Sequence, residues 1–184
     1  MTKIIGFAGS LRKGSYHKMA LKVVLDNVKQ AGAETEFIDL KELDIPLYDG
    51  DLEQEIKLPK GIKTLKEKIE KADGLILAIP EYNHSVSGVM KNTIDWLSRT
   101  TFFPSVLDNK KTAIFSASDG MIGGARAQIA FYPTAVTLNL DLMPSKVYIP
   151  NVNQKFDEAG NLVDEKTREG LRKFAAKFVE FVKK

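Results

Sequence analysis

Cysteine is absent from this chain of 184 residues. The absence excludes disulfides, thiol redox chemistry, Fe–S clusters and cysteine-rich zinc sites. His84 has no Cys, Asp or His neighbour at metal-ligand spacing, so it is interpreted as a loop residue and no metal site is predicted. Any redox chemistry must therefore come from a bound cofactor.

Long apolar runs are also absent. No stretch approaches the ~20 apolar residues that a membrane helix needs, and the first residues lack the apolar segment and small-residue cleavage site of a signal peptide. We therefore expect a soluble, cytoplasmic protein without a membrane partner. The formal net charge is only +3, and lysines are interleaved with glutamates, as in residues 66–71, so no nucleic-acid partner is expected.

Strand-like and helix-like segments alternate along the chain, and 43% of its residues are apolar. This pattern predicts one domain, 1–184, of the α/β class with right-handed crossovers. The expected architecture is a flavodoxin-like three-layer sandwich: a five-stranded parallel sheet in the order 2-1-3-4-5 with helices on both faces. Residues 41–60 are expected to be irregular, Pro133 to interrupt or kink its helix, and Pro144 to break the last strand early. Strands are expected at 3–8, 35–40, 74–79, 111–116 and 142–149, and helices at 15–31, 61–72, 87–99, 124–140 and 167–183.

The first strand leads into a loop, Gly9–His17, that reads G-S-L-R-K-G-S-Y-H. Its small residues let backbone N–H groups approach a ligand, and the helix N-terminus that follows attracts negative charge. Ser10 and Ser15 add hydroxyl donors, and the guanidinium of Arg12 matches a phosphate. The loop lacks both G-x-G-x-x-G and the lysine that a Walker A motif needs after Gly14. We predict a phosphate cradle; the alternative is that Ser15 only caps the helix and Arg12 is solvated.

The third strand leads into a second loop, Pro80–Asn83, that reads P-E-Y-N. A polar loop at the carboxyl end of a buried strand can present N–H groups to the carbonyl oxygens of a ring, and Tyr82 can lie against its flat face. The alternative is that Tyr82 is an ordinary surface aromatic. Trp96 is interpreted as a core residue because it lies at helical spacing with Ile94 and Leu97.

The fourth strand leads into a third loop, residues 116–126, which is small, polar and rich in glycine. Alone, this loop would be no more than a flexible turn before a helix. Three such loops, however, follow the first, third and fourth strands, and ligands of open α/β sheets bind beyond the carboxyl ends of the strands. The sequence therefore predicts one ligand site that carries a phosphate and a flat ring.

The motif G-S-L-R-K-G-S, followed by P-E-Y-N-x-S-x-x-G-x-x-K-N-x-I-D-W-x-S-R, resembles the NADPH-dependent FMN reductase family, especially its chromate/quinone reductase and azoreductase branch. Leu43–Asp49 and Ile122–Arg126 are similar to that family's loops after the second and fourth strands. The resemblance implies FMN as cofactor and NADPH or NADH as co-substrate. It implies an enzyme that passes hydride from nicotinamide to FMN and then reduces a small-molecule acceptor: a quinone, an azo or nitro compound, chromate or free flavin.

The resemblance also implies which residues contact the cofactor. The family usually has Asn where this chain has His17, whose imidazole can still donate a hydrogen bond to a phosphate. No side-chain acid or nucleophile is predicted, because the flavin carries the chemistry. A homodimer with flavin sites near the subunit interface is implied, or a homotetramer as in some members. The residues so implied are, for the phosphate, Ser10, Arg12, Ser15 and His17 and, for the isoalloxazine, Pro80, Glu81, Tyr82, Asn83 and Ser118.

Two other classes of protein share the expected fold. A flavodoxin-type electron carrier without NAD(P)H oxidase activity is the main alternative, although such carriers are strongly acidic and this chain is mildly basic, with Arg12 in its first loop. A receiver-like signalling domain needs acidic residues at the ends of the first and third strands. This chain has Ala8–Ser10 and Pro80–Glu81 there, which excludes it.

Overall fold

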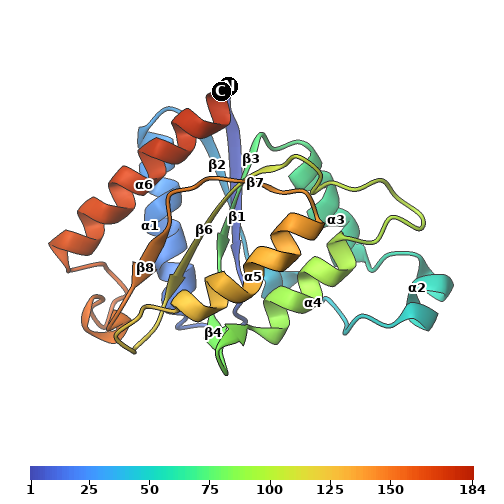
Figure 1. Ribbon diagram of the computed structural model, residues 1–184, viewed down its shortest axis with the longest axis horizontal. Helices are drawn as coiled ribbons and strands as arrows, with labels where there is room; N and C mark the ends of the chain where they lie inside the picture. The colour runs from blue at the N-terminus through green and yellow to red at the C-terminus, as the bar shows by residue number, and fades with distance from the viewer.

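A parallel sheet forms the centre of the computed structural model, which describes residues 1–184 (Figure 1). The strand order is β2-β1-β3-β6-β7, and β8 pairs with β6 beyond the end of β7. All pairs in this sheet are parallel. The predicted class and order are confirmed. The strands are β1 (Lys3–Ala8), β2 (Glu34–Ile38), β3 (Gly74–Ala78), β6 (Lys111–Ala117), β7 (Asp141–Leu142) and β8 (Val147–Ile149).

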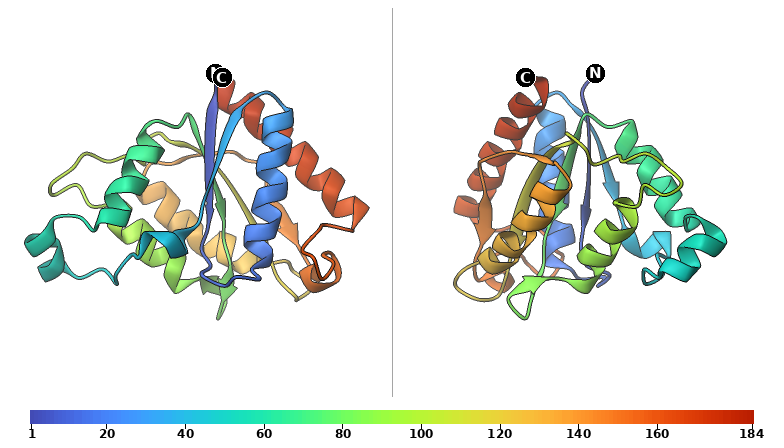
Figure 2. Two further views of the ribbon diagram at one scale, coloured as in Figure 1. Left: turned by 180° about the vertical axis from the view of Figure 1, so that it is seen from behind. Right: turned by 45° about the vertical axis from the view of Figure 1, so that its right-hand side comes forward.

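Helices cover both faces of the sheet, as Figure 2 shows. One core cluster joins the sheet to α1 and α6, and the other joins it to α3, α4 and α5. No helix combines the length and apolarity needed to cross a membrane. The helices are α1 (Tyr16–Gln30), α2 (Gly50–Ile56), α3 (Lys60–Glu70), α4 (Gly88–Leu97), α5 (Ala125–Thr137) and α6 (Glu165–Lys183), with 3-10 turns η1 (Leu40–Leu43) and η2 (Val152–Gln154).

The central strands are almost continuously apolar because both of their faces are covered. Successive side chains of β1 point to opposite faces: Ile4 and Ala8 belong to the cluster under α1, whereas Ile5 and Phe7 belong to the cluster under α3 and α4. Each fully buried side chain of this size contributes about 1.5–3 kcal/mol. The two clusters fix the sheet and hence the positions of the loops at its carboxyl edge, opposite the two termini (Figure 1).

The expected last strand is divided. Asp141–Leu142 pair with the start of β6, whereas Val147–Ile149 pair with its end. Pro144 lies between the two pieces and has no N–H to donate to a sheet. The break predicted at this proline is therefore confirmed.

Helix α5 continues through Pro133 to Thr137, whereas the sequence predicted an interruption or a kink. The proline ring cannot donate the usual hydrogen bond to the carbonyl one turn earlier, at Ile129. Both residues lie on the exposed side of the helix, so that the loss falls at the surface rather than in the core. The loss of this one backbone hydrogen bond at the surface does not end the helix.

Two segments that were expected to be irregular have regular structure. The P-E-Y-N stretch begins a hairpin, in which β4 (Glu81–Tyr82) pairs antiparallel with β5 (Ser85–Val86). Its turn residues have φ of 50° and 62°, the left-handed region that a tight two-residue hairpin turn requires. The stretch 41–60 contains part of η1 and the whole of α2, which Asp49 caps by accepting a hydrogen bond from Asp51 N at 2.8 Å.

Candidate functional site

The three loops meet at the carboxyl edge of the sheet around a cavity of about 190 Å³. Every predicted site residue except Asn83 lines this cavity. Asn83 lies in the hairpin turn instead, with a φ of 50°. The roles of the predicted residues toward a ligand stay predictions, but the structure shows that they come together from distant parts of the chain. The lining residues are Ser10, Arg12, Ser15, Tyr16, His17, Pro80, Glu81, Tyr82, Ala117, Ser118, Asp119 and Val152.

The first loop offers donors to an anion. Ser15 is the N-cap of α1, and its hydroxyl oxygen accepts a hydrogen bond from Lys18 N at 3.4 Å, which leaves the O–H free to donate. Capping and ligand binding by Ser15 are therefore compatible. The first turn of α1 contains no acidic side chain that would occupy its free N–H groups. Arg12 is exposed and forms no ion pair with the protein, so that its guanidinium is available.

Close packing of Gly9 against α4 fixes where this loop begins. A Cβ atom at Gly9 would lie 2.7 Å from Met90 Cβ and 2.8 Å from Ser87 Oγ. The Ser87 hydroxyl donates to the Gly9 carbonyl at 2.6 Å and accepts from Met90 N at 3.1 Å. Ser87 thus caps α4 and ties it to the first loop. Sequence reasoning placed Ser87 at the helix start but missed this second contact.

His17 connects the first loop to the ends of two strands. Its Nε2 accepts a hydrogen bond from Ala117 N at 3.2 Å, and the Ile79 backbone forms a further hydrogen bond with the ring. Burial lowers the pKa of His17 to about 4, so that the imidazole is neutral at pH 7. The ring nitrogens are directed at the backbone of the cavity wall. His17 therefore holds the wall together rather than presenting a charge to a phosphate.

Glu81 connects the hairpin to α5. Its Oε2 accepts hydrogen bonds from Arg126 N at 3.1 Å and Ala127 N at 3.4 Å. These are free N–H groups of the first turn of α5, whose own N-cap, Gly124, has no side chain to satisfy them. The Glu81 carboxylate is thus used within the protein, and only its backbone remains for a ligand. The neighbouring Tyr82 side chain is 52% exposed at the mouth of the cavity.

Ser118 and the glycines behind it shape the third loop. Ser118 Oγ accepts from Gly120 N at 3.0 Å, and its N–H donates to Ile149 O at 3.0 Å. Gly123 has a φ of 60°, and a Cβ there would lie 2.8 Å from Ile149 N. Gly123 is therefore required where the loop passes against the end of β8.

Some lining residues were not predicted. Tyr16 and Asp119 adjoin predicted residues, so that widening each motif by one position would have found them. Ala117 is the last residue of β6, and its contribution is its backbone. Val152 comes from η2, beyond β8, and no local pattern marks it as part of a site.

A second cavity of about 540 Å³ adjoins the first, and the two share Ser10, Arg12 and Tyr82. Together they form one depression of the size that small ligands occupy. Its lining includes hydroxyl groups, a helix N-terminus and a guanidinium, which suit a phosphate. It also includes an aromatic side chain and residues of the hairpin, which suit a flat polar ring. The donor set therefore fits a phosphorylated, planar ligand.

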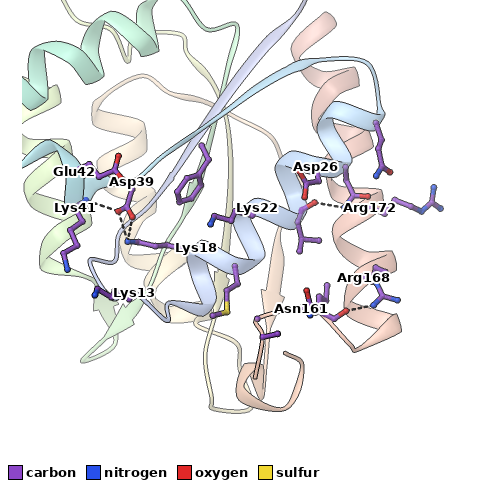
Figure 3. Close-up of a pocket in the computed structure, with 18 residues that line it drawn as sticks. Lys13, Lys18, Lys22, Asp26, Asp39, Lys41, Glu42, Asn161, Arg168 and Arg172 are labelled. Atoms are coloured by element: carbon purple, nitrogen blue, oxygen red, sulfur yellow. Dashed lines mark hydrogen bonds and ion pairs between the residues drawn. The ribbon is translucent and has the colours of Figure 1, made fainter. Parts of the chain in front are cut away.

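A larger groove of about 1000 Å³ runs along α1, but none of the predicted site residues lines it (Figure 3). Its buried cation is neutralised, because Lys18 Nζ lies 2.7 Å from both carboxylate oxygens of Asp39. At its other end, Arg172 Nε lies 2.7 Å from Glu169 Oε2. Because these charges are already paired and no predicted site residue lies here, we place the site in the smaller cavities.

Comparisons with known proteins agree with this geometry. The profile of the NADPH-dependent FMN reductase family matches residues 2–154. An NAD(P)H-dependent FMN reductase of Pseudomonas aeruginosa is 40% identical over 91% of this chain and 88% of its own length. A quinone reductase of Escherichia coli is 38% identical over 99% of this chain and 96% of its own. The solved structure of a flavoenzyme NAD(P)H:(acceptor) oxidoreductase from Paracoccus denitrificans superposes with a TM-score of 0.82 at 29% identity, covering 100% of this chain and 98% of the other.

Proposed function

The chain belongs to the NADPH-dependent FMN reductase family, and from this we propose that it oxidises NADPH or NADH and reduces quinones through FMN held at the carboxyl edge of its sheet. The balanced reaction is NAD(P)H + H⁺ + quinone → NAD(P)⁺ + hydroquinone. The observation that carries the proposal is the convergence of three separate loops on one cavity whose donors suit a phosphate and a ring.

FMN, when bound, would supply the two-electron redox chemistry that couples nicotinamide oxidation to reduction of the acceptor. Ser10, Arg12 and Ser15 would hold its phosphate. The backbone of Pro80–Asn83 would meet the polar edge of its ring, with Ser118 approaching from the third loop. Support comes from the free donors of the first loop and from the position of the hairpin across the same cavity.

The side chains of the site position the cofactor rather than transfer protons. We assign no general acid or base, because the Glu81 carboxylate caps α5 and His17 is neutral and bonded to the backbone. The protons taken up by the acceptor would come from water at the open mouth of the cavity, where Tyr82 is 52% exposed. Rate enhancement would then come from holding donor and acceptor against one ring.

An open mouth also supports acceptors of several shapes. Azo and nitro compounds, chromate and free flavin are proposed as further acceptors. The support for them is the resemblance of the sequence motifs to the azoreductase and chromate reductase branch of the family. Quinones remain the acceptors with the stronger support, because named relatives reduce them.

We propose that residues 1–184 form a single domain and that the enzyme is a homodimer, or a homotetramer built from such dimers. Support comes from an apolar stripe, here called the α5 seam, on the outer face of α5. Ile129 is 66% exposed and Val136 is 75% exposed. With Pro133 they lie at i, i+4 and i+7, which places all three on one side of the helix. A second copy of the seam would cover this apolar surface.

A steady-state assay tests the proposal. The purified protein should carry a flavin spectrum, and it should oxidise NADPH or NADH rapidly when a quinone is added but not when every proposed acceptor is left out. A flavodoxin-type electron carrier would bind the flavin but would show almost no nucleotide oxidation. A protein that neither carries nor takes up FMN would contradict the proposal outright.

A further inference from the structure

The segment Pro46–Tyr48 is fastened to α4 by two side chains that the proposed function does not use. Asn92 Nδ2 donates to the Pro46 carbonyl at 2.8 Å, and Asn92 Oδ1 accepts from Tyr48 N at 2.8 Å. Trp96 Nε1 donates to the same Pro46 carbonyl at 2.9 Å. Both side chains belong to the K-N-x-I-D-W motif, and neither lines the cavity of the three loops.

Tyr48 is held at its side chain as well. Its ring packs edge-on against Trp96 with centroids 5.0 Å apart, and its hydroxyl donates to Glu53 Oε2 at 2.9 Å. The Glu53 side chain is only 2% exposed, and Arg99 Nε donates to the same oxygen at 2.9 Å. The backbone on both sides of Leu47 is thus rigid, yet the Leu47 residue itself is 81% exposed.

Leu47 borders a cavity of about 380 Å³, here called the Leu47 cavity. It shares Leu11, Gly88 and Val89 with the cavity that reaches Tyr82, so that the two are continuous past the first turn of α4. A Cβ at Gly88 would meet no atom within 4 Å, and its absence leaves this passage wide. The lining residues are Leu11, Leu40, Lys41, Asp44, Ile45, Leu47, Gly88, Val89, Asn92 and Thr93.

The chemistry of the Leu47 cavity favours an apolar ligand. Its polar side chains from α4 already have partners: Asn92 binds the Pro46–Tyr48 backbone, and Thr93 Oγ1 donates to Val89 O at 2.8 Å. Its two charged residues, Lys41 and Asp44, have opposite signs and leave no net charge to attract an ion. Apart from Gly88, the remaining lining is leucine, isoleucine and valine, part of which is in water unless a ligand covers it.

We propose that the Leu47 cavity binds the alkyl or prenyl side chain of a quinone whose ring lies in the flavin site. The inference rests on the proposed function and names the substrate class more closely: quinones with an apolar substituent. Continuity between the two cavities sets the direction of the substituent, from Tyr82 past Gly88 to Leu47. Asn92 and Trp96 act as positioning residues, because they hold the backbone that carries Leu47 and do not touch the reacting atoms.

A series of benzoquinones with no alkyl chain or with chains of two, four and six carbons tests this proposal. The FMN-loaded enzyme is assayed for kcat/KM, and binding of each quinone to the oxidised enzyme without nucleotide is measured by titration calorimetry. Each methylene buried in an apolar site strengthens binding about fourfold. The kcat/KM of the wild type should therefore rise at least about tenfold from the tailless quinone to the butyl derivative, and Kd should fall in parallel.

The variant Leu47→Asp should reduce that rise to less than about twofold. Asn92→Ala should raise KM for the butyl quinone about tenfold while kcat for the same quinone changes less than twofold, which a general loss of folding would not produce. Val163→Asp is the matched control, since Val163 is 54% exposed and lies outside these cavities. It should keep the wild-type dependence on chain length.

Other outcomes would overturn the proposal. An equal rise in the wild type and Leu47→Asp, or no rise in the wild type, removes the subsite. A change in oligomeric state of Leu47→Asp in sedimentation velocity would show that a second copy covers Leu47 instead. Failure of the wild type to reduce any quinone of the series would contradict the proposed function, and the calorimetric series would then test the subsite alone.

Discussion

Arg12 is the charged side chain that this account places on the FMN phosphate. A hydrogen bond between two charged groups contributes about 1.5–3 kcal/mol. Arg12→Ala should therefore weaken FMN affinity about 10- to 100-fold, measured by flavin fluorescence on titration of the flavin-free protein. Arg12→Lys should lose less FMN affinity, because it keeps the positive charge. It should still lose some, because lysine lacks the two-pronged geometry of the guanidinium. Unchanged affinity in Arg12→Ala would remove Arg12 from the site.

His17 makes stability depend on pH. Its pKa is about 4 in the folded protein against 6.5 for the free side chain, so that the unfolded chain binds more protons between these values. Above pH 6.5 His17 does not reduce the free energy of unfolding. As the pH falls from 6.5 toward 4, the unfolded chain takes up a proton that the folded protein does not, and the free energy of unfolding decreases. Between pH 7 and pH 4.5 the wild type should lose roughly 2 kcal/mol more unfolding free energy than His17→Asn. Urea titrations at the two pH values measure this, and parallel losses would contradict it.

A substitution at Gly9 tests how tightly the first loop packs against α4. A methyl group there would lie 2.7 Å from Met90 Cβ, so that Gly9→Ala should cost about 1–3 kcal/mol of unfolding free energy. Gly14, in the same loop, is the matched control, because a Cβ there meets no atom within 4 Å. Urea unfolding of the flavin-free variants compares them directly. Similar losses at both positions would show that the contact is not what requires glycine.

At the scale of single elements, the α5 seam predicts the oligomer. Ile129→Lys places a charge in the middle of an apolar stripe, which an interface would have to desolvate. We expect sedimentation velocity to show a dimer for the wild type and mostly monomer for this variant. Val163→Lys, at an exposed apolar position outside the seam, should stay dimeric. A dimer that persists in Ile129→Lys would place the interface elsewhere.

The sequence predicted the elements whose cause is local. Strand β1 was predicted at its observed bounds, because an apolar run and a glycine are both visible in the chain. The hairpin at Glu81–Val86 was not, because each of its strands has only two residues and its turn uses Asn83 and His84 rather than a glycine. An interruption or a kink of α5 was predicted at Pro133, but the helix continues through it to Thr137. The exposure of that residue depends on the fold and cannot be seen in the local sequence.

At the scale of the whole molecule, the position of the site followed from topology. Parallel strands bring their carboxyl ends to one edge, so that three loops far apart in sequence were expected to meet, and they do. The contacts that hold those loops together were not predictable. The hydrogen bond between His17 and Ala117 joins residues 100 positions apart in the sequence, and the one between Glu81 and Arg126 joins residues 45 apart. Such pairs depend on the packed arrangement of α1, α5 and the sheet.

We propose that the three loops hold a flavin by its phosphate as well as by its ring. The most direct measurement is a titration of the flavin-free protein with FMN and with riboflavin, which has the same ring but no phosphate. Because charged hydrogen bonds to the phosphate are lost, riboflavin should bind at least about 100-fold more weakly than FMN. Equal affinities for the two flavins would contradict the account.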